Sequence, residues 1–230
     1  MMTDKELHPK HGMMLLIDKP KEFSSAKIVN IIKKKLNIKK AGHSGTLDPK
    51  ASGLMIVCTD GMTKDLKTFL DFDKEYEGIM VLGKSTASFD SETEVTIEFP
   101  VNNISEEQIF NTANMFIGDI SQVPPPFSAV KYKGKPLYKY ARKNHYLEVS
   151  PRQVLIKEFE ITNISIPEVS FRVLCSKGTY IRSLVNDFGK ELGVGAYLTE
   201  LRRIKIGKYN VKDSIPLEHF LLGENSIYNN

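Results

Sequence analysis

Apolar residues along this chain fall into short runs and into segments with helical spacing. Six runs have the length of a strand, and residues 168–175 alternate most cleanly between apolar and polar positions. The predicted strands cover residues 13–18, 54–59, 75–82, 153–161, 168–175 and 198–206. Because irregular loops and only a few helices separate them, we expect an α+β fold with a mixed, mainly antiparallel central sheet flanked by helices and loops.

Four segments carry helix signals. Ser24 or Ser25 can cap a first helix, and residues 63–70 predict a short second one. The apolar side of the first helix is Ile28, Ile32 and Leu36. A capping box at residues 105–108 opens the third helix. That helix is expected to bury Ile109, Ala113, Phe116 and Ile117 and to stop at Gly118. The fourth runs from about Thr179 to a stop at Gly193.

Two segments are predicted to lack regular structure. Residues 41–49 form a turn-rich loop, and three prolines at residues 124–126 open a basic, tyrosine-rich insertion. A charged loop of this length is normally exposed and functional or mobile. We expect tails at residues 1–11 and 223–230, and one domain over residues 12–222 that includes the insertion at residues 124–150.

Composition narrows the class of protein. The chain has 41% hydrophobic residues, enough for a sizeable core. No apolar run is long enough to span a bilayer, and the charged N-terminus lacks a signal-peptide pattern, so we expect a cytoplasmic protein. Cys58 and Cys175 lie in apolar surroundings without metal-ligand spacing, so we expect them reduced and buried.

The distribution of charge is more informative than the net charge of +4. Residues 1–40 hold ten lysines against four acids, and residues 127–147 hold six cations and no acid. Four tyrosines are interleaved with the second set of cations. Lysines neutralise phosphates and aromatic rings stack on unstacked bases, so the pattern suits RNA, although a solvated lysine-rich face explains it equally well.

Two loops pair an unusual backbone with a charged side chain. Gly45 and Pro49 flank Asp48, and this arrangement can hold a carboxylate rigidly toward a cleft. Taken alone, Asp48 is more simply interpreted as a cap of residues 49–53. In the second loop, residues 175–182, Arg182 can pair with a carboxylate and keep it ionised. A surface arginine is the simpler interpretation of that residue alone.

Together these loops resemble the tRNA pseudouridine synthase B family. Its motifs occur in order and at matching spacing over about residues 12–219. The matching segments are residues 42–49 with 51–53, residues 73–76, residues 126–131 with 134–142, residues 175–182 and residues 201–203.

The resemblance implies the pseudouridine synthase fold and a cofactor-free isomerase that converts uridine 55 in the T-loop of tRNA to pseudouridine. Asp48 is then the nucleophile, Tyr76 stacks on the flipped uracil and helps move its C5 proton, and Arg182 pairs with Asp48. The reaction involves neither redox change nor hydrolysis, so we expect no metal, nicotinamide or nucleotide. A carboxylate can attack the sugar or the base, and the sequence leaves both routes open.

Further residues would contact the RNA in such an enzyme. Tyr180 and Leu201 line the uracil pocket, and His43 enters the space that bases vacate. The border of the RNA groove is formed by Lys19, Pro20 and Lys131. The insertion clamps the T-arm of the tRNA and is expected to be mobile without it.

Three features depart from the family pattern. Lys50 stands where an apolar residue is usual, and Phe127 stands where tyrosine is frequent. Many relatives carry a further small RNA-binding domain, which we expect this chain to lack. We also expect a monomer that needs no protein partner.

Three other functions compete with this one. The first is an RNA-folding chaperone on the same scaffold, and the second is the same chemistry on another RNA, as in guide-dependent relatives. The third is a glycosidase, which would need a second acid beside Asp48, where the motifs supply an arginine.

Overall fold

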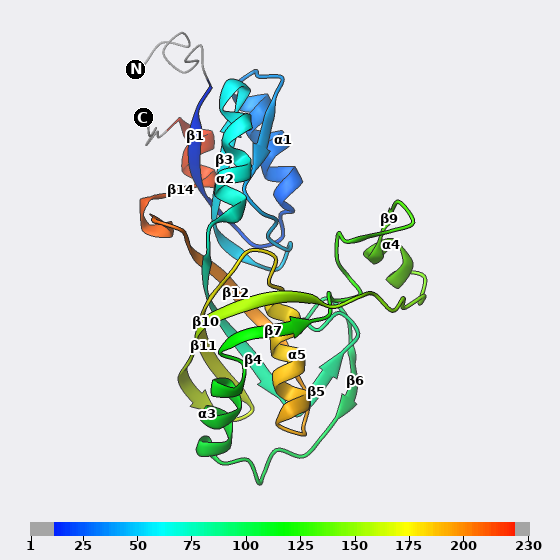
Figure 1. Cartoon of the computed structure of the whole chain (residues 1–230). Coiled ribbons are helices and arrows are strands. Elements are labelled where there is room, and N and C mark those ends of the chain that lie inside the picture. Colours follow the sequence, from blue (N-terminus) through cyan, green and yellow to red (C-terminus); the bar gives the residue numbers. More distant parts are fainter. Residues whose placement is uncertain (1–11, 224–230) are drawn as a thin grey trace. The chain divides into compact units, whose positions relative to one another are not determined.

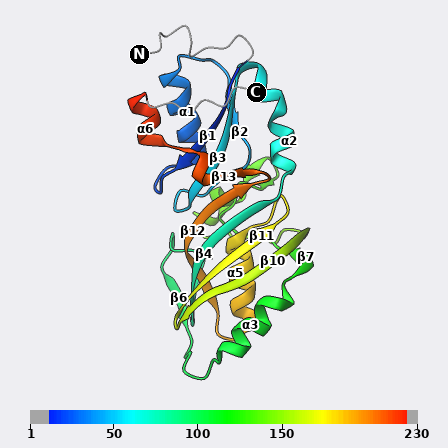
Figure 2. The ribbon, with the colours of Figure 1, turned by 90° about the vertical axis from the view of Figure 1, so that its left-hand side faces the viewer.

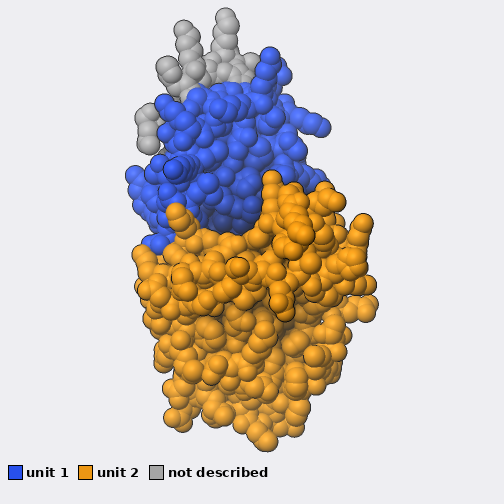
Figure 3. Space-filling model, turned by 45° about the vertical axis from the view of Figure 1, so that its right-hand side comes forward, with its two compact units in different colours: residues 1–76, 202–230 blue, residues 77–201 orange. Residues whose placement is uncertain are grey.

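The computed structural model describes residues 12–223 (Figure 1). The chain forms two compact units. The first unit comprises residues 1–76 and 202–230, and the second comprises residues 77–201 (Figure 3). The predicted tails fall outside the described residues except for Gly223, and the predicted single domain over residues 12–222 stays a prediction.

The sheet of the first unit has the strand order β14–β1–β3–β12, with β2 beside β3 and β13 beside β12. Pairs of β3 with β1 and β2 are antiparallel, whereas β1 runs parallel to β14 and β3 runs parallel to β12. The strands are β1 (Met14–Lys19), β2 (Ala41–His43), β3 (Ser52–Thr59), β12 (Ala196–Ile206), β13 (Tyr209–Asn210) and β14 (Ile215–Pro216).

Three neighbouring strands of this sheet meet at Gly53. Lys19 of β1 lies opposite Gly53 in the register of β1 and β3, and Arg203 lies opposite the same glycine in the register of β3 and β12. A Cβ atom on Gly53 would lie 2.3 Å from the backbone oxygen of Arg203, and the φ angle of Gly53 is +106°. Glycine is therefore required for β12 to approach β3 at this point.

Helices α1 (Ser25–Lys35), α2 (Leu66–Asp71) and α6 (Leu217–Leu222) complete the first unit, together with the 3₁₀ turns η1 (Asp60–Asp65) and η2 (Val211–Asp213). Ser24 caps α1 by accepting a hydrogen bond from the backbone N–H of Lys27, as its position predicts. One hydrophobic cluster joins β1, β3, α2 and β12. Its buried members are Met14, Leu16, Leu54, Ile56, Cys58, Phe69 and Ile206.

The sheet of the second unit has the order β12–β4–β11–β10–β7, and its described pairs of β10 with β11 and β7 are antiparallel. Its strands are β4 (Lys74–Leu82), β7 (Gly118–Gln122), β10 (Arg152–Ser165) and β11 (Glu168–Cys175), with the first part of β12. A separate hairpin consists of β5 (Lys84–Thr86) and β6 (Val95–Glu98). The predicted alternation of β11 is confirmed, because Val169, Phe171, Val173 and Cys175 are buried.

Helices α3 (Glu106–Met115) and α5 (Ile181–Glu191) lie against this sheet (Figure 2). Phe188 of α5 packs edge-to-face on Phe159 of β10, with their ring centroids 5.9 Å apart. The predicted capping box of α3 is confirmed at Ser105 and Gln108. The predicted burial of Ile117 is wrong: it is 46% exposed, because α3 ends at Met115 and Ile117 no longer follows the helical spacing.

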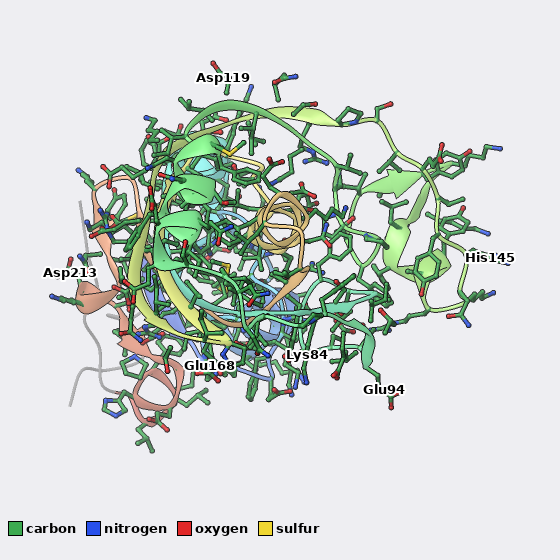
Figure 4. All side chains as sticks on the ribbon, turned by 90° about the horizontal axis from the view of Figure 1, so that it is seen from below. Lys84, Glu94, Asp119, His145, Glu168 and Asp213 are labelled. Carbon is green, nitrogen blue, oxygen red and sulfur yellow. The ribbon has the colours of Figure 1, made fainter. Side chains whose placement is uncertain are left out.

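The insertion at residues 124–150 contains a small hairpin, β8 (Lys131–Tyr132) and β9 (Lys135–Pro136), followed by helix α4 (Leu137–Ala141). In the second unit it stands off from the main sheet, with His145 at its outer end (Figures 1 and 4). Leu137 and Ala141 of α4 are the buried apolar residues of that helix. The mobility expected of this segment stays a prediction.

The predicted α+β fold with a mainly antiparallel sheet is confirmed, as are all six predicted strands. Residues 41–43, which we expected to belong to a loop, instead form β2, because β3 offers them a backbone partner. Strands β5 to β9, β13 and β14 and helices α4 and α6 were not predicted, and three of these elements lie in the insertion that we expected to lack regular structure. Cys58 and Cys175 are buried and form no disulfide, as expected. Among the described helices, none has the length and apolar content required to cross a bilayer.

Candidate active site

Asp48 lies on a loop between β2 and β3 whose backbone is tied down at several points. The Ser25 hydroxyl accepts from the backbone N–H of Leu47 at 2.8 Å and donates to its carbonyl at 3.0 Å. The N–H of Ala51 donates to the carbonyl of Asp48, and the N–H of Glu22 donates to that of Pro49. Asp48 is half-buried, and the segment after it is a turn and not a helix. This geometry disfavours the helix-cap interpretation and suits a held carboxylate.

Lys19 is buried under this loop with no exposed surface. Its ammonium group donates to the carbonyls of Pro20 at 2.9 Å, Phe23 at 2.7 Å and Pro49 at 3.4 Å. Burial lowers the pKa of Lys19 to about 8, and the charge of Arg203 acts in the same direction, whereas Asp48 opposes the shift. Lys19 is therefore an electrostatic neighbour of Asp48. Its ammonium faces the protein, while Pro20, the other residue expected at the RNA groove, is exposed.

His43 is the last residue of β2, opposite Val57 of β3. Burial lowers its pKa, and the positive charge of Arg203 lowers it further, while a hydrogen bond with the Gly45 backbone acts in the opposite direction. The ring is therefore neutral at pH 7, when it presents a flat polar surface without a charge. This property suits insertion among bases.

Tyr76 is buried on β4, in the first unit. Its neighbour Glu75 is also buried and forms an ion pair with Lys205 at 2.7 Å. Before them, Lys74 donates to the carbonyls of Phe69 at 3.3 Å, Leu70 at 2.6 Å and Phe72 at 2.5 Å. These carbonyls end α2, so Lys74 joins the end of that helix to the start of β4. The strand that carries Tyr76 is thereby anchored by charged groups.

Arg182 lies in the first turn of α5, in the second unit, and its side chain is 4% exposed. Its guanidinium is 3.5 Å from the carboxylate of Asp90, which is equally buried, and it donates to the carbonyls of Ser88 at 3.1 Å and Phe127 at 3.0 Å. These contacts fix the plane of the guanidinium. The predicted pair of Arg182 with Asp48 joins residues of different units and stays a prediction.

Tyr180 immediately precedes α5. Its N–H donates to the amide oxygen of Gln122 at 2.8 Å, and its carbonyl accepts from the amide nitrogen of Gln122 at 3.0 Å. The guanidinium of Arg152 lies 5.2 Å from the centre of its ring, within the range of a cation–π interaction. Leu201 of β12 is buried in the same unit. Gln122 thus holds the backbone of Tyr180, and Arg152 contacts its ring.

Lys131 is exposed on β8, within a surface that carries most of the cations of the insertion. Tyr132 and Tyr140 pack edge-to-face there, with their ring centroids 6.2 Å apart. Arg142 lies over the ring of Tyr138 and forms an ion pair with Glu92 at 3.5 Å. The Glu92 contact links the insertion to the loop that also carries Asp90.

The predicted site residues therefore divide between the units. Asp48 and Lys19 lie close together in the first unit. The charge of Arg203 acts on both Lys19 and His43 there, and Tyr76 lies on β4 of the same unit. Tyr180, Arg182, Leu201 and Lys131 lie in the second unit. Sequence reasoning did not assign roles to Arg203, Asp90 or Gln122. Arg203 was inside a matched motif, but the other two gave no local signal, because their partners are distant in sequence.

Two family models match the chain. The model described as TruB family pseudouridylate synthase (N terminal domain) matches residues 33–181. The model described as tRNA pseudouridylate synthase B C-terminal domain matches residues 182–225, which begin in α5. The first match alone covers more than half of the chain.

Curated relatives are similar over most of their length. A tRNA pseudouridine synthase B of Flavobacterium johnsoniae is 48% identical over 216 residues, which cover 91% of this chain and 94% of the relative. A protein of the same name from Phocaeicola vulgatus is 42% identical over 217 residues, with 92% of each chain covered. A third, from Clostridium tetani, is 44% identical over 200 residues, 87% of this chain and 69% of the relative.

Solved structures with the same fold are more distant. A chain in the structure of an H/ACA RNP bound to a substrate RNA containing 2′-deoxyuridine is 30% identical, with a TM-score of 0.71 over 94% of this chain. A chain of a Cbf5–Nop10–Gar1 complex is 32% identical, also with a TM-score of 0.71. The present chain spans 54% and 55% of those two chains.

Proposed function

Because the chain belongs to the TruB family of pseudouridylate synthases, we propose that it isomerises uridine 55 in the T-loop of tRNA, with Asp48 as the nucleophile. Family membership makes it a pseudouridine synthase with the pseudouridine synthase fold, an enzyme of RNA modification. The position of the target uridine and the role of Asp48 are the parts that need a test.

One observation carries the assignment of Asp48. Its carboxylate sits on a turn whose backbone is bonded to Ser25, Lys19 and Ala51, with the buried ammonium of Lys19 as an electrostatic neighbour. A held carboxylate loses little entropy when it attacks a bound substrate. The nearby ammonium of Lys19 attracts the carboxylate of Asp48. Both conditions are those that a nucleophilic carboxylate needs.

The reaction exchanges one bond to the sugar for another. The glycosidic bond between N1 and C1′ breaks, the uracil turns, and a bond between C5 and C1′ forms. The proton on C5 leaves, and N1 gains one, so the product is an isomer. In this proposal Asp48 forms a transient covalent adduct, Tyr76 stacks on the uracil and helps move the C5 proton, and Arg182 orients Asp48.

Access to the base requires that the uridine leave its stack, at a cost of about a few kcal/mol. Stacking on Tyr76 offsets about 1–3 kcal/mol of this cost, and the neutral ring of His43 occupies the vacated space. Tyr180 and Leu201 line the uracil pocket. Pro20, Lys131 and the exposed lysines of the insertion contact the tRNA backbone, with Lys19 supporting the groove from within.

Substitution of Asp48 by asparagine tests the proposal. We expect Asp48→Asn to abolish pseudouridine formation in a T-arm stem-loop, while the Kd for the RNA rises less than about threefold, because only the nucleophile is lost. Asp213→Asn, at an exposed aspartate labelled in Figure 4, is the matched control and should retain full activity. Turnover of the Asp48→Asn protein at the wild-type rate would exclude the nucleophile assignment.

A second candidate is the same chemistry on a guided RNA. It is favoured by the structural similarity to chains of H/ACA complexes, of which this chain spans about half. Incubation of the purified protein with a bare T-arm stem-loop separates the two. Product without an added guide or protein partner supports the tRNA substrate, and absence of product until a guide is added supports the alternative.

Refolding of a misfolded tRNA by Asp48→Asn would reveal an RNA-chaperone activity apart from catalysis. We propose that the enzyme works as a cytoplasmic monomer without cofactor, metal or obligatory protein partner. Sedimentation of the active protein with and without tRNA checks the oligomeric state, and retained activity after exhaustive treatment with a chelator checks the metal.

A further inference from the structure

Arg203 is the largest fully buried side chain among residues 12–223, and it lies in the first unit. Its Nε donates to the carbonyl of Leu54 at 2.8 Å, and its Nη2 donates to the carbonyl of Gly45 at 3.2 Å. These two carbonyls lie before and after Asp48 in the chain. A single guanidinium group therefore bridges the start of the loop that carries Asp48 and strand β3, which follows that loop.

We propose that Arg203 is a positioning residue for Asp48, which it serves by holding Gly45, at the start of the loop, at a constant separation from Leu54 in β3. The inference rests on the proposed role of Asp48 as nucleophile. Arg203 itself donates to backbone oxygens, so it acts through the loop and not on the substrate.

The choice of arginine follows from this geometry. The planar guanidinium presents donors in different directions, whereas a lysine ammonium is a compact group on a flexible stem. The Nε and Nη2 atoms of Arg203 donate to carbonyls on two segments of backbone at once. Burial strengthens both hydrogen bonds, since a charged donor in a water-poor environment interacts more strongly with a carbonyl dipole.

Gly53 makes the arrangement possible. Arg203 and Gly53 are partners in the parallel register of β12 and β3, and the backbone of Arg203 occupies the space that a Cβ of residue 53 would need. Substitution of Gly53 by alanine would push the Arg203 backbone away from the loop. The two residues therefore provide independent ways to disturb the same contact.

Arg203 also affects the charges around the loop. Its proximity contributes to the lowered pKa of His43 and of Lys19, in each case after burial itself. Removal of the guanidinium should therefore raise the pKa of His43. This change can be measured without RNA, so it is independent of what Asp48 does in catalysis.

The test compares Arg203→Gln and Arg203→Lys with Arg202→Gln. Arg202 is the adjacent residue, is partly exposed and forms an ion pair with Asp18 at 2.6 Å, so it serves as the matched control. For Arg203→Gln we expect the single-turnover rate constant to fall by about 100-fold, as for a nucleophile displaced by about 1 Å. The Kd for the T-arm should change less than about threefold, because RNA contacts are untouched. Arg203→Lys should recover part of the rate, and Arg202→Gln nearly all of it.

Two measurements on the free protein accompany the kinetics. Amide hydrogen exchange within residues 44–49 should accelerate in Arg203→Gln and not in Arg202→Gln. The NMR titration of His43, assigned through a His43→Gln protein, should move to higher pH in Arg203→Gln. Unchanged exchange at residues 44–49 together with a rate near that of the wild type would overturn the proposal.

A folding defect would not leave the proposal open. If Arg203→Gln does not fold, Arg203→Lys and Gly53→Ala replace it, and full activity with wild-type exchange in both would exclude the positioning role. Failure of the proposed function is separate, because it would appear as an active Asp48→Asn protein while the exchange result for Arg203 stood.

Discussion

The two loops that carry the predicted catalytic groups are held in different ways. In the first unit, the Asp48 loop is bonded to two buried cations, Lys19 and Arg203, which donate to its carbonyls. In the second unit, Tyr180 is held by the neutral amide of Gln122 through one donated and one accepted hydrogen bond. Both devices restrain a backbone, but only the cations also impose a positive potential on the loop. The contribution of the first loop to rate and stability should therefore depend on pH, whereas that of the second loop should not.

Arg182 combines features of both arrangements. It is a buried cation that donates to two carbonyls, and it also has a carboxylate partner, Asp90. Arg142 forms an ion pair with Glu92 at the same distance of 3.5 Å, but on the surface of the second unit. The two acids are two positions apart in the chain, so they offer a direct comparison of a buried pair with an exposed one.

The largest effect is expected at Asp90. Asp90→Asn removes a buried negative charge beside the Arg182 guanidinium, and the free energy of unfolding should fall by about 3 kcal/mol. Glu92→Gln should lower it by no more than about 1 kcal/mol, because that pair is solvated. Denaturant unfolding of both proteins measures the difference. Equal losses would mean that burial does not distinguish the two pairs.

A smaller effect is expected at Gln122. Gln122→Met leaves the N–H and carbonyl of Tyr180 without their amide partner, and the free energy of unfolding should fall by about 2 kcal/mol. The single-turnover rate should fall by about 10-fold to 100-fold, since Tyr180 is less well placed. Neither loss should vary between pH 6 and 9, because no titrating group is removed. Gln153→Met, at an exposed glutamine of β10, is the control. A loss in Gln122→Met that varied with pH would contradict the expected difference between the two loops.

The pH dependence of the Asp48 loop should come from Lys19, whose pKa is lowered from 10.5 to about 8. As the pH rises through about 8, Lys19 loses its charge, so the single-turnover rate should fall. Stability should move in the opposite direction. Between about 8 and 10.5 the unfolded chain still binds the proton that the folded chain has released, so the contribution of Lys19 to stability rises with pH and is lost as the pH falls.

Lys19→Met provides the comparison for both curves. Its rate should be lower but level through pH 8, and its stability should lack the rise above that pH. Rate profiles and denaturant unfolding over the same buffers measure the two effects. Identical pH profiles in the wild type and in Lys19→Met would refute the assignment of this titration to Lys19.

The smallest effect on chemistry is expected in the insertion. Alanine at Lys133, Lys135 and Lys139, all exposed, should weaken RNA binding and reduce the slope of log Kd against log salt by about three, if each lysine contacts one phosphate. The rate at saturating RNA should be unchanged. Lys212→Ala in the first unit is a control that should leave the slope as it is. A slope that stays at the wild-type value in the triple variant would show that this surface does not contact phosphates.

Much of the fold could be predicted from local patterns. The capping box at Ser105 and Gln108 and the Ser24 cap are signals contained within a few residues, and both helices begin where those signals predict. The alternation of β11 likewise reports its buried face. Strand β2 and Ile117 were misjudged for a related reason. A short strand depends on its partner β3, and the exposure of Ile117 depends on where α3 ends.

The candidate site was only partly accessible from the sequence. The motifs indicated Asp48, Tyr76 and Arg182, and the proline and glycine beside Asp48 indicated a turn. Nothing local indicated that Asp90 is the acid beside Arg182, or that Gln122 holds the backbone of Tyr180. Each of those contacts joins segments more than fifty positions apart.

The sequence by itself determined the six longest strands, the caps, the basic insertion and the set of residues proposed for the chemistry. These properties depend on side-chain type and on spacing over one or two turns of backbone. The tertiary structure decided which charges lie together. Arg203 reaches Leu54 and Gly45 across 149 and 158 positions of chain, and Lys19 meets the same loop from another strand. Those contacts exist because β1, β3 and β12 pair in one register at Gly53, and the free energy of that pairing is shared by the whole unit.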